Sequence, residues 1–187
     1  WYLILSKAGL LAPAWPVEHG GMALKPAKHI IYLEELDRAG CPWMPEQGTM
    51  NVGPALIIHG NDEQRAKYLP DAIAGQTIGA YAITEPNTGS DAAGLATSAK
   101  KTSNGYVING RKNFITNGNI CDFCLVAAYT DKEKRGEGIS VFIVDRDTPG
   151  FEVTRKLEKM GHRSSDTAEL VFENCEVGEE TLLGGKE

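Results

Sequence analysis

The sequence has few basic residues and no long apolar run, and these two absences reduce the number of function classes to consider. Lys and Arg number 19 against 25 Asp and Glu, which gives a net charge of −6. Because phosphate neutralisation needs a basic surface, this balance argues against nucleic acid as the main partner. The longest apolar runs, residues 53–58 and 123–129, are far shorter than the roughly 20 residues that span a bilayer. We therefore expect no membrane span.

Signatures of metal, dinucleotide and triad sites are also missing. Four cysteines stand at positions 41, 121, 124 and 175, and Cys121 and Cys124 form a single CxxC pair. Without a second pair or nearby histidines this spacing is weak evidence for zinc, so we interpret both as ordinary strand residues. No GxGxxG follows a predicted strand, and no His has the neighbours of a catalytic triad. The sequence thus predicts neither a metal site nor a Rossmann fold.

What is present begins with a helical part, residues 1–75. The apolar spacing predicts helices over residues 1–11, 25–39, 49–59 and 61–69, and the third is the least polar and is expected to be well buried. Asn61 is predicted to cap the last helix, with Gln64 as its capping-box partner, and Pro70 is predicted to end it. The chain begins with Trp1, inside a helical pattern, so we interpret this part as an incomplete helical domain.

From about Thr77 the pattern changes to strands, and residues 76–183 are predicted to form a β-domain. Asn-Gly dipeptides at 104–105, 109–110 and 117–118 are strong hairpin signals. Strands are expected over residues 78–84, 93–102, 105–109, 112–116, 123–129, 139–145, 151–157 and 168–177. Many short strands at this spacing indicate an antiparallel barrel or sandwich. The charged residues 131–138 are interpreted as a solvated hairpin tip. The predicted fold class is α+β, a helical bundle portion followed by an antiparallel β-barrel or sandwich.

Within the β-domain the run 81–91 carries the most information. An apolar strand stops at Glu85-Pro86, and a loop with Gly89, Ser90 and Asp91 follows. This run resembles the flavin-binding signature of the acyl-CoA dehydrogenase family. Residues 112–118, Lys-Asn-Phe-Ile-Thr-Asn-Gly, resemble that family's second flavin-contacting segment. Residues 11–21 and 161–167 also resemble the family, so the likeness covers essentially the whole chain but only the middle of a family-length protein.

The resemblance implies FAD as cofactor and names a set of residues on this chain that would bind it. These are Tyr81, Ala82, Ile83, Thr84, Gly89, Ser90, Phe114, Ile115 and Thr116. Thr84 would bond near the pyrimidine edge of the flavin, and Tyr81 and Ile83 would line the ring. Gly89 would let the backbone approach closely. Ser90 would contact the flavin phosphate or the acyl-CoA pantetheine arm, and with Ala92 it forms the expected substrate contact.

In the second segment Phe114 would pack near the dimethylbenzene side of the ring, and Thr116 would reach N5. Phe114 stands where many family members have Trp, so an aromatic ring is kept while the indole N–H is lost. Thr88 is bulkier than the residue usual at its position in the family. Arg163 is open to two interpretations, a phosphate ligand or a turn residue paired with Asp166 or Glu169.

The family's reaction is α,β-dehydrogenation of an acyl-CoA thioester, with hydride transfer to flavin N5. Its base is a Glu, usually from a C-terminal helical domain, which we expect to begin at residues 184–187. The base itself is expected beyond Glu187, the last residue of the sequence. We therefore assign no catalytic residue here, and interpret Glu85 as a structural carboxylate beside Pro86.

The resemblance also implies partners and a location. Electrons would pass to an electron-transfer flavoprotein, and the full protein would be a homo-oligomer, a tetramer or a dimer. It would act in the cytoplasm of a bacterium or in the mitochondrial matrix of a eukaryote. The alternatives left open are an acyl-CoA oxidase or flavin monooxygenase relative that uses O2, and a non-catalytic module of the same fold.

Overall fold

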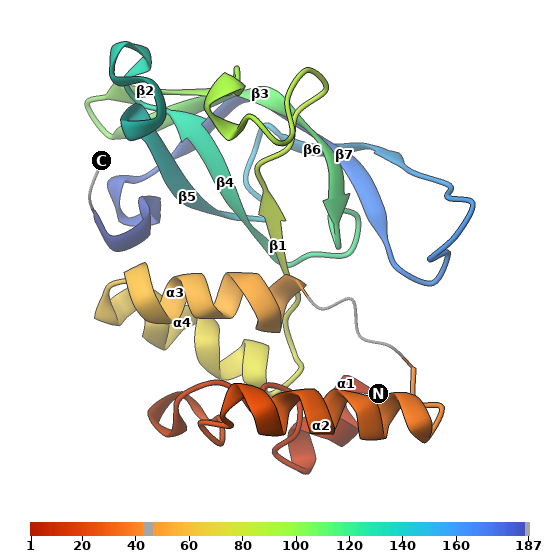
Figure 1. Ribbon diagram of the computed structural model, residues 1–187. Helices are drawn as coiled ribbons and strands as arrows, with labels where there is room; N and C mark the ends of the chain where they lie inside the picture. The colour runs from red at the N-terminus through yellow and green to blue at the C-terminus, as the bar shows by residue number, and fades with distance from the viewer. Residues whose placement is uncertain (43–46, 186–187) are drawn as a thin grey trace.

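The chain folds into a helical part and a curled β-sheet, as the α+β prediction requires. The computed structural model describes residues 1–42 and 47–185. In Figure 1 the helices lie below the sheet, and the polypeptide passes from one part to the other into β1. No helix in the described ranges is long and apolar enough to cross a bilayer.

The predicted start of a further helical domain, residues 184–187, is described only in part. Gly184 and Gly185 belong to a short 3-10 turn, Leu183–Gly185, and not to an α-helix. Lys186 and Glu187 lie outside the described residues. A catalytic base beyond Glu187 therefore stays a prediction, and the structure does not test it.

The helical part contains four α-helices: α1 (Tyr2–Lys7), α2 (Pro26–Arg38), α3 (Gly53–His59) and α4 (Asp62–Ile73). The first is shorter than predicted because Gly9, at φ +70°, turns the chain after Ala8. The helix predicted over 49–59 starts as a π-helical turn, Gly48–Val52, and continues as α3. It is not well buried, since Met50 and Ile58 are 57% and 71% exposed. Only its other face, with Val52 and Leu56, packs against the sheet.

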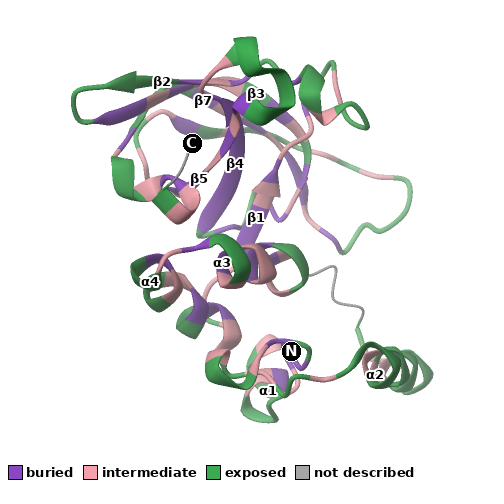
Figure 2. Cartoon of the chain, turned by 60° about the vertical axis from the view of Figure 1, so that its left-hand side comes forward, coloured by how far each residue is buried: buried purple, intermediate pink, exposed green. Residues whose placement is uncertain are grey.

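Helix α2 matches its predicted range but contains no buried residue. Figure 2 shows it coloured as exposed along nearly its whole length, in contrast to the sheet. Its apolar side chains Ile30, Ile31 and Leu33 are more than 40% exposed. The helix therefore contributes little to the core of the described chain.

The predicted capping box of α4 is confirmed. The Asn61 side chain accepts from the Gln64 N–H at 2.8 Å, and the Gln64 side chain accepts from the Asn61 N–H at 3.1 Å. The predicted end at Pro70 is wrong, because α4 continues to Ile73 with the proline inside it. Ala66 and Pro70 are both exposed, so water can replace the hydrogen bond that proline cannot donate.

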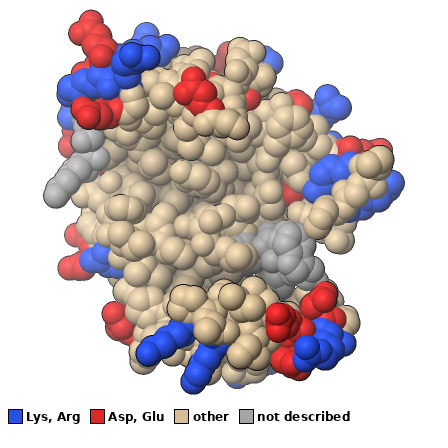
Figure 3. Space-filling view, in the orientation of Figure 1, with Lys and Arg blue, Asp and Glu red and all other residues tan. Residues whose placement is uncertain are grey.

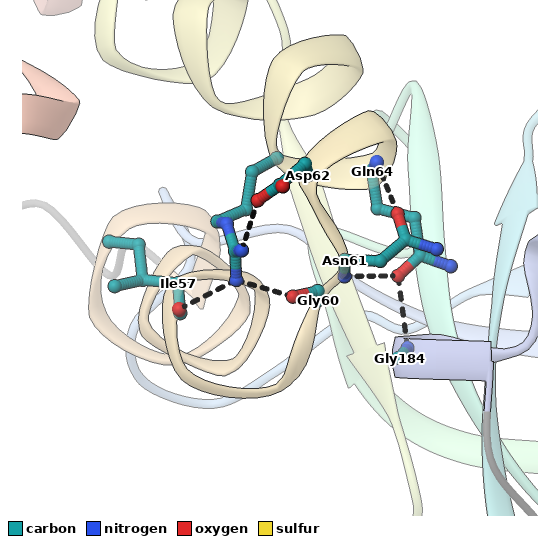
Figure 4. Close-up of polar contacts among 7 residues, drawn as sticks. Ile57, Gly60, Asn61, Asp62, Gln64 and Gly184 are labelled. Atoms are coloured by element: carbon teal, nitrogen blue, oxygen red, sulfur yellow. Dashed lines mark hydrogen bonds and ion pairs between the residues drawn. The ribbon is translucent and has the colours of Figure 1, made fainter.

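Gln64 also joins the helical part to the end of the chain (Figure 4). Its Nε2 donates to the carbonyls of Glu180 and Leu182, both at 2.8 Å, and its Oε1 accepts from the Gly184 N–H at 3.0 Å. Gly184 has φ +72°, and a Cβ there would lie 2.4 Å from the His59 carbonyl oxygen. This close approach requires glycine and fixes the segment after the last strand against α3 and α4.

The strands are β1 (Gly79–Ala82), β2 (Ser98–Thr102), β3 (Gly105–Thr116), β4 (Phe123–Tyr129), β5 (Ile139–Asp145), β6 (Phe151–Lys156) and β7 (Thr167–Val177). They form one sheet in the order β1-β4-β2-β3-β7-β6, with β5 on the other edge of β4. Most pairs are antiparallel, as predicted, but β1 and β2 pair with β4 in parallel, so the sheet is mixed. Residues 131–138 do connect β4 to β5 and are largely exposed.

Two predicted strands, 105–109 and 112–116, are a single strand, β3. It crosses the sheet beside β7 with register shifts between Ile108 and Gly110 and between Lys112 and Ile115. The Asn109-Gly110 dipeptide therefore marks a bulge rather than a hairpin tip. The Asn-Gly dipeptide at 104–105 is the turn between β2 and β3, as predicted, and the one at 117–118 is a turn after β3.

Strand β4 is central to the fold: all seven of its residues are buried, and they contribute to the cores on both faces of the sheet. Its alternate side chains serve two faces: Cys124 and Val126 face the interior of the curled sheet, while Leu125 packs with Trp15 and Leu56 of the helical part. Strand β1 pairs with residues 123–126 of β4, and β2 pairs with Tyr129 on the same edge. Residues 83–97 consequently leave the sheet after β1 and return to the same edge at β2.

Candidate functional site

The excursion 83–97 contains most of the run 81–91, and it lies directly against the second predicted segment. The Asn113 N–H donates to the Thr84 carbonyl at 2.8 Å, which joins the two segments across 29 residues of sequence. The structure thus brings together the two stretches that the sequence singled out. Residues 93–97, which the sequence analysis expects to be strand, are not strand.

At Ala96 and Thr97 the reason is the Glu85 carboxylate. It accepts from the N–H groups of Ala96 at 2.6 Å and Thr97 at 3.0 Å, so these groups do not enter a β-ladder. The same carboxylate lies 2.8 Å from the Lys112 ammonium, which also donates to the Ile83 carbonyl at 3.3 Å. The Lys112 side chain is fully buried and that of Glu85 is 5% exposed. Glu85 is therefore a structural carboxylate, as expected.

Burial and pairing act on both groups of this ion pair. Burial alone would raise the pKa of Glu85, but the hydrogen bonds from Lys112, Thr97 and Ala96 outweigh it and hold that pKa below its usual range. Burial lowers the pKa of Lys112, and the attraction of Glu85 opposes this only in part. The hydrogen bonds have more effect than burial on the pKa of Glu85, because several donors surround its carboxylate. At Lys112, burial has more effect on the pKa than the pairing with Glu85 does.

The loop after Glu85 begins with a tight turn and continues as an exposed segment. Glu85 and Thr88 exchange backbone hydrogen bonds at 2.9 and 3.2 Å, which exposes Pro86 and Asn87 at the tip. Gly89 and Ser90 are exposed, and Ala92 starts a short 3-10 turn, Ala92–Gly94. A Cβ on Gly89 would meet no atom within 4 Å. Packing within the chain does not require glycine there, so room for a second molecule remains beside the backbone.

Phe114 is the strained residue of the site. It has φ +58° at the second register shift of β3, and its side chain is 65% exposed. A left-handed conformation costs a non-glycine residue about 1–2 kcal/mol, and such strain is concentrated at functional sites. The Asn113 side chain accepts from the Phe114 N–H at 2.9 Å and helps to hold this geometry. The large aromatic ring of Phe114 is thus exposed to solvent, and its backbone adopts a left-handed conformation that is unfavourable for phenylalanine.

The other predicted residues divide by where their side chains lie. Ala82 and Ile115 are almost fully buried in the core of the sheet, so only their backbone groups can meet a ligand. Tyr81 packs against the core that the helices share with the sheet, and Ile83 packs against Leu95 and Tyr129. The hydroxyls of Thr84, Ser90 and Thr116 have no hydrogen-bond partner in the described part of the chain.

Figure 3 shows charged side chains mainly at the edges of the face viewed in Figure 1, with an uncharged centre. A cavity of about 620 Å³ lies elsewhere, between the 11–16 segment, α2 and α3. None of the predicted flavin residues lines it, so cavity size alone does not locate this site.

The remaining sequence motifs concern metal ligands, the CxxC pair and Arg163. Across residues 1–42 and 47–185, no three His, Cys, Asp or Glu side chains are grouped as metal ligands. Cys121 and Cys124 are both buried, but only Cys124 lies in a strand, β4, because Cys121 precedes the start of that strand at Phe123. Arg163 is exposed, and its two expected partners are engaged elsewhere: Asp166 accepts from the Asn119 N–H at 2.8 Å, and Glu169 lies 3.8 Å from Arg155.

From the sequence alone, Lys112 has no assigned role beyond being the first residue of its segment. A lysine in an alternating strand is ordinarily a solvated residue, and nothing local distinguishes this one. Its partner is 27 positions away, so only the three-dimensional fold reveals the pair.

Residues 80–175 match the family model described as acyl-CoA dehydrogenase, middle domain, and residues 3–76 match acyl-CoA dehydrogenase, N-terminal domain. The chain belongs to the acyl-CoA dehydrogenase family. It is 44% identical to the mitochondrial isovaleryl-CoA dehydrogenase of Oryza sativa subsp. japonica over 94% of this chain and 43% of that protein. The chain spans about half the length of the curated relatives it matches.

Solved structures of other members agree with this assignment. The acyl-CoA dehydrogenase from Geobacillus kaustophilus aligns with a TM-score of 0.88 and 38% identity, over 98% of this chain and 49% of that one. A prolyl acyl carrier protein oxidase aligns with a TM-score of 0.88 and 33% identity, over 98% and 50%. Proteins with this fold therefore include some that are named dehydrogenases and some that are named oxidases.

Proposed function

We propose that this chain supplies one wall of the flavin and acyl-CoA site of an acyl-CoA dehydrogenase. The observation that carries the proposal is the backbone contact between Thr84 and Asn113, which unites the two family segments at one place. The reaction would be α,β-dehydrogenation of an acyl-CoA thioester. The mitochondrial relative's name, isovaleryl-CoA dehydrogenase, favours a short branched acyl group as the first substrate to test.

The residues present fit FAD. Thr84, Ser90 and Thr116 have unused hydroxyls, and Gly89 has open space beside it. Phe114 offers an exposed aromatic face for the edge of a flat ring. When bound, the flavin would supply the hydride acceptor that no amino-acid side chain provides. The protein's part is to hold the ring against a rigid strand end and to direct hydrogen bonds to its polar edge.

Neither Glu85 nor another described carboxylate is proposed as the catalytic base. A general base must reach the substrate and have a pKa near the working pH. Glu85 is buried against Lys112, and its pKa is held below the usual range. We propose that the base comes from a part of the full-length protein beyond Glu187, as the family resemblance implies.

The same proposal includes the partners. The substrate would be an acyl-CoA, with Ser90 and Ala92 at its contact, and an electron-transfer flavoprotein would accept the electrons. Relatives occur both in mitochondria and in bacteria, which supports a matrix or a cytoplasmic location according to the source. Homo-oligomerisation is proposed on the family resemblance.

The oxidase reaction is the second candidate, and the similarity to the prolyl acyl carrier protein oxidase favours it. The fold described here is common to both reactions. The test is to reduce the purified full-length protein with acyl-CoA in the absence of oxygen and then to add either O2 or an artificial electron acceptor. Rapid reoxidation by the acceptor with slow reoxidation by O2 supports the dehydrogenase, and the reverse order supports the oxidase.

The non-catalytic alternative makes a simpler prediction. If the protein is only a module of this fold, the full-length form is colourless and takes up no FAD when it is reconstituted. A visible flavin spectrum that bleaches on addition of isovaleryl-CoA without oxygen is the expected result. A flavin spectrum that no acyl-CoA of any chain type bleaches contradicts the proposed reaction.

A further inference from the structure

We propose that Glu85 and Lys112 form a positioning pair that fixes the two flavin segments relative to each other. Neither side chain is proposed to touch flavin or substrate. They act through their neighbours, because Thr84 precedes Glu85 directly and Phe114 lies two residues after Lys112. The inference rests on the proposed function and adds a role for two residues outside the expected cofactor set.

The pair joins four pieces of backbone that no β-ladder holds together. The Lys112 ammonium bonds to the Ile83 carbonyl at the end of β1 and to the Glu85 carboxylate. That carboxylate bonds to the N–H groups of Ala96 and Thr97 on the returning side of the loop. A single buried contact at 2.8 Å therefore sets the path of residues 83–97 and the approach of β3.

Few other bonds in the described chain could do this. Residues 83–97 run between the end of β1 and the start of β2, so they have no strand partner. Backbone bonds tie this loop to the sheet from Asn113 to the Thr84 carbonyl and from Tyr129 to the Thr97 carbonyl, and the Tyr129 hydroxyl donates to the Ala93 carbonyl. These bonds fix the two ends and the returning side of the loop, whereas the ion pair fixes the corner at Glu85.

A contribution to stability is a weak explanation for the pair. Burying two charges takes them out of water, and the attraction regained is often no better than apolar packing of the same volume. Lys112 lies close to Cys124, which belongs with Ala82 to the apolar core of the sheet. A charged pair differs from apolar packing in being directional, since only one placement of the Nζ satisfies the Glu85 and Ile83 oxygens together. A directional contact is suited to holding the two flavin segments in one fixed arrangement.

The test uses the full-length holoprotein and three variants. Lys112→Met and Glu85→Gln each leave one partner, and the double variant Glu85→Gln/Lys112→Met removes both charges. The Glu85 carboxylate accepts from Ala96 and Thr97 through different oxygens, and Gln keeps one of these two acceptors. The control is Lys67→Met, which breaks the Lys67–Asp145 pair at 2.9 Å. That pair also joins distant segments, but its side chains are 61% and 40% exposed and lie away from the flavin segments.

Three measurements separate positioning from stability: the denaturation midpoint of the apoprotein, the FAD dissociation constant from flavin fluorescence, and the flavin reduction potential with its visible spectrum. We expect the double variant to fold with a midpoint near that of the wild type. Its FAD affinity is expected to fall tenfold or more, with a shifted potential and a changed spectrum. Lys67→Met is expected to leave affinity, potential and spectrum unchanged.

The double variant decides the case even if Lys112→Met does not fold, because it leaves no unpaired buried charge. If it folds and binds FAD with the wild-type affinity, potential and spectrum, the pair is only structural and the inference is overturned. If the wild-type protein itself binds no flavin, the proposed function fails first. A wild type that binds FAD, together with variants that behave like Lys67→Met, overturns the positioning role alone.

Discussion

The Asn113 N–H donates to the Thr84 carbonyl across 2.8 Å, at the point where β1 has ended and β3 bends. Thr84 is itself proposed to meet the flavin, Asn113 directly precedes Phe114, and the bond between them is part of the main chain. Substitution of either side chain leaves it in place. The contact between the two segments is therefore a property of the fold, while the exact shape of the site depends on side chains that can be changed one at a time.

Phe114 is the first of these side chains to test. Replacing it with Gly removes the left-handed strain, worth about 1–2 kcal/mol, and adds chain entropy in the unfolded state, worth about 0.5–1 kcal/mol. The ring is 65% exposed, so little packing is lost. We expect Phe114→Gly to leave the free energy of unfolding unchanged or raised by up to about 1 kcal/mol, while FAD affinity falls.

The matched control is Asn174→Gly, which relieves a φ of +47° at an exposed position outside the flavin segments. Its stability should change in the same direction, with no effect on FAD. A Phe114→Gly protein that is strongly destabilised, or that keeps full FAD affinity, would contradict the role given to Phe114.

Gln64 holds the helical part against the end of the chain, and its removal should weaken the fold. Gln64→Ala deletes bonds to Glu180, Leu182 and Gly184 and breaks the capping box with Asn61. Since each lost hydrogen bond is worth about 1 kcal/mol, we expect a loss of roughly 2–4 kcal/mol in urea denaturation. Gln76→Ala, at an exposed position, should have almost no effect. Equal midpoints for the two variants would show that Gln64 is not a structural link.

These helical features also show what a sequence can predict. The capping box of Asn61 and Gln64 and the ranges of β4 and β5 were predicted correctly, because a cap or a periodic run is a local property. The continuation of α4 through Pro70 was not, since it depends on that residue's exposure in the fold. The Glu85–Lys112 pair was missed because the two residues are distant in sequence. The same Glu85 carboxylate bonds to the N–H groups of Ala96 and Thr97, which explains why these two residues are not strand.

The stability of the chain should respond to acid through Glu85. Its folded pKa lies below the ordinary value of 4.5, so between the two values the unfolded chain binds more protons. Stability from this group is full above the unfolded pKa and is lost as pH falls through the folded pKa.

We expect wild-type stability, measured by urea denaturation at several pH values below 4.5, to fall more steeply with acid than that of Glu85→Gln. Parallel curves for the two proteins would mean that Glu85 has the same pKa in the folded and unfolded states.

The four cysteines should differ in reactivity. Burial raises the pKa of Cys121 and Cys175 to about 11 and that of Cys124 well above its usual range. Because the thiolate is the reactive form, these three should be inert in the native protein. Cys41 is only half-buried, so a thiol reagent should modify this one cysteine rapidly. The Cys41→Ser variant should lack the rapid phase of modification. More than one fast thiol in the native wild type would indicate a looser β-domain than described.

The central claim is that residues 81–91 and 112–118 form one wall of a flavin site. An experimental structure of the full-length holoprotein tests it most directly. We predict that the flavin ring lies against the Thr84–Asn113 contact, with the Thr84 and Thr116 hydroxyls within a hydrogen-bond distance of about 3.2 Å of its polar atoms, and with Phe114 at its edge. A flavin bound elsewhere, with those hydroxyls out of hydrogen-bond reach of the ring, would contradict the account.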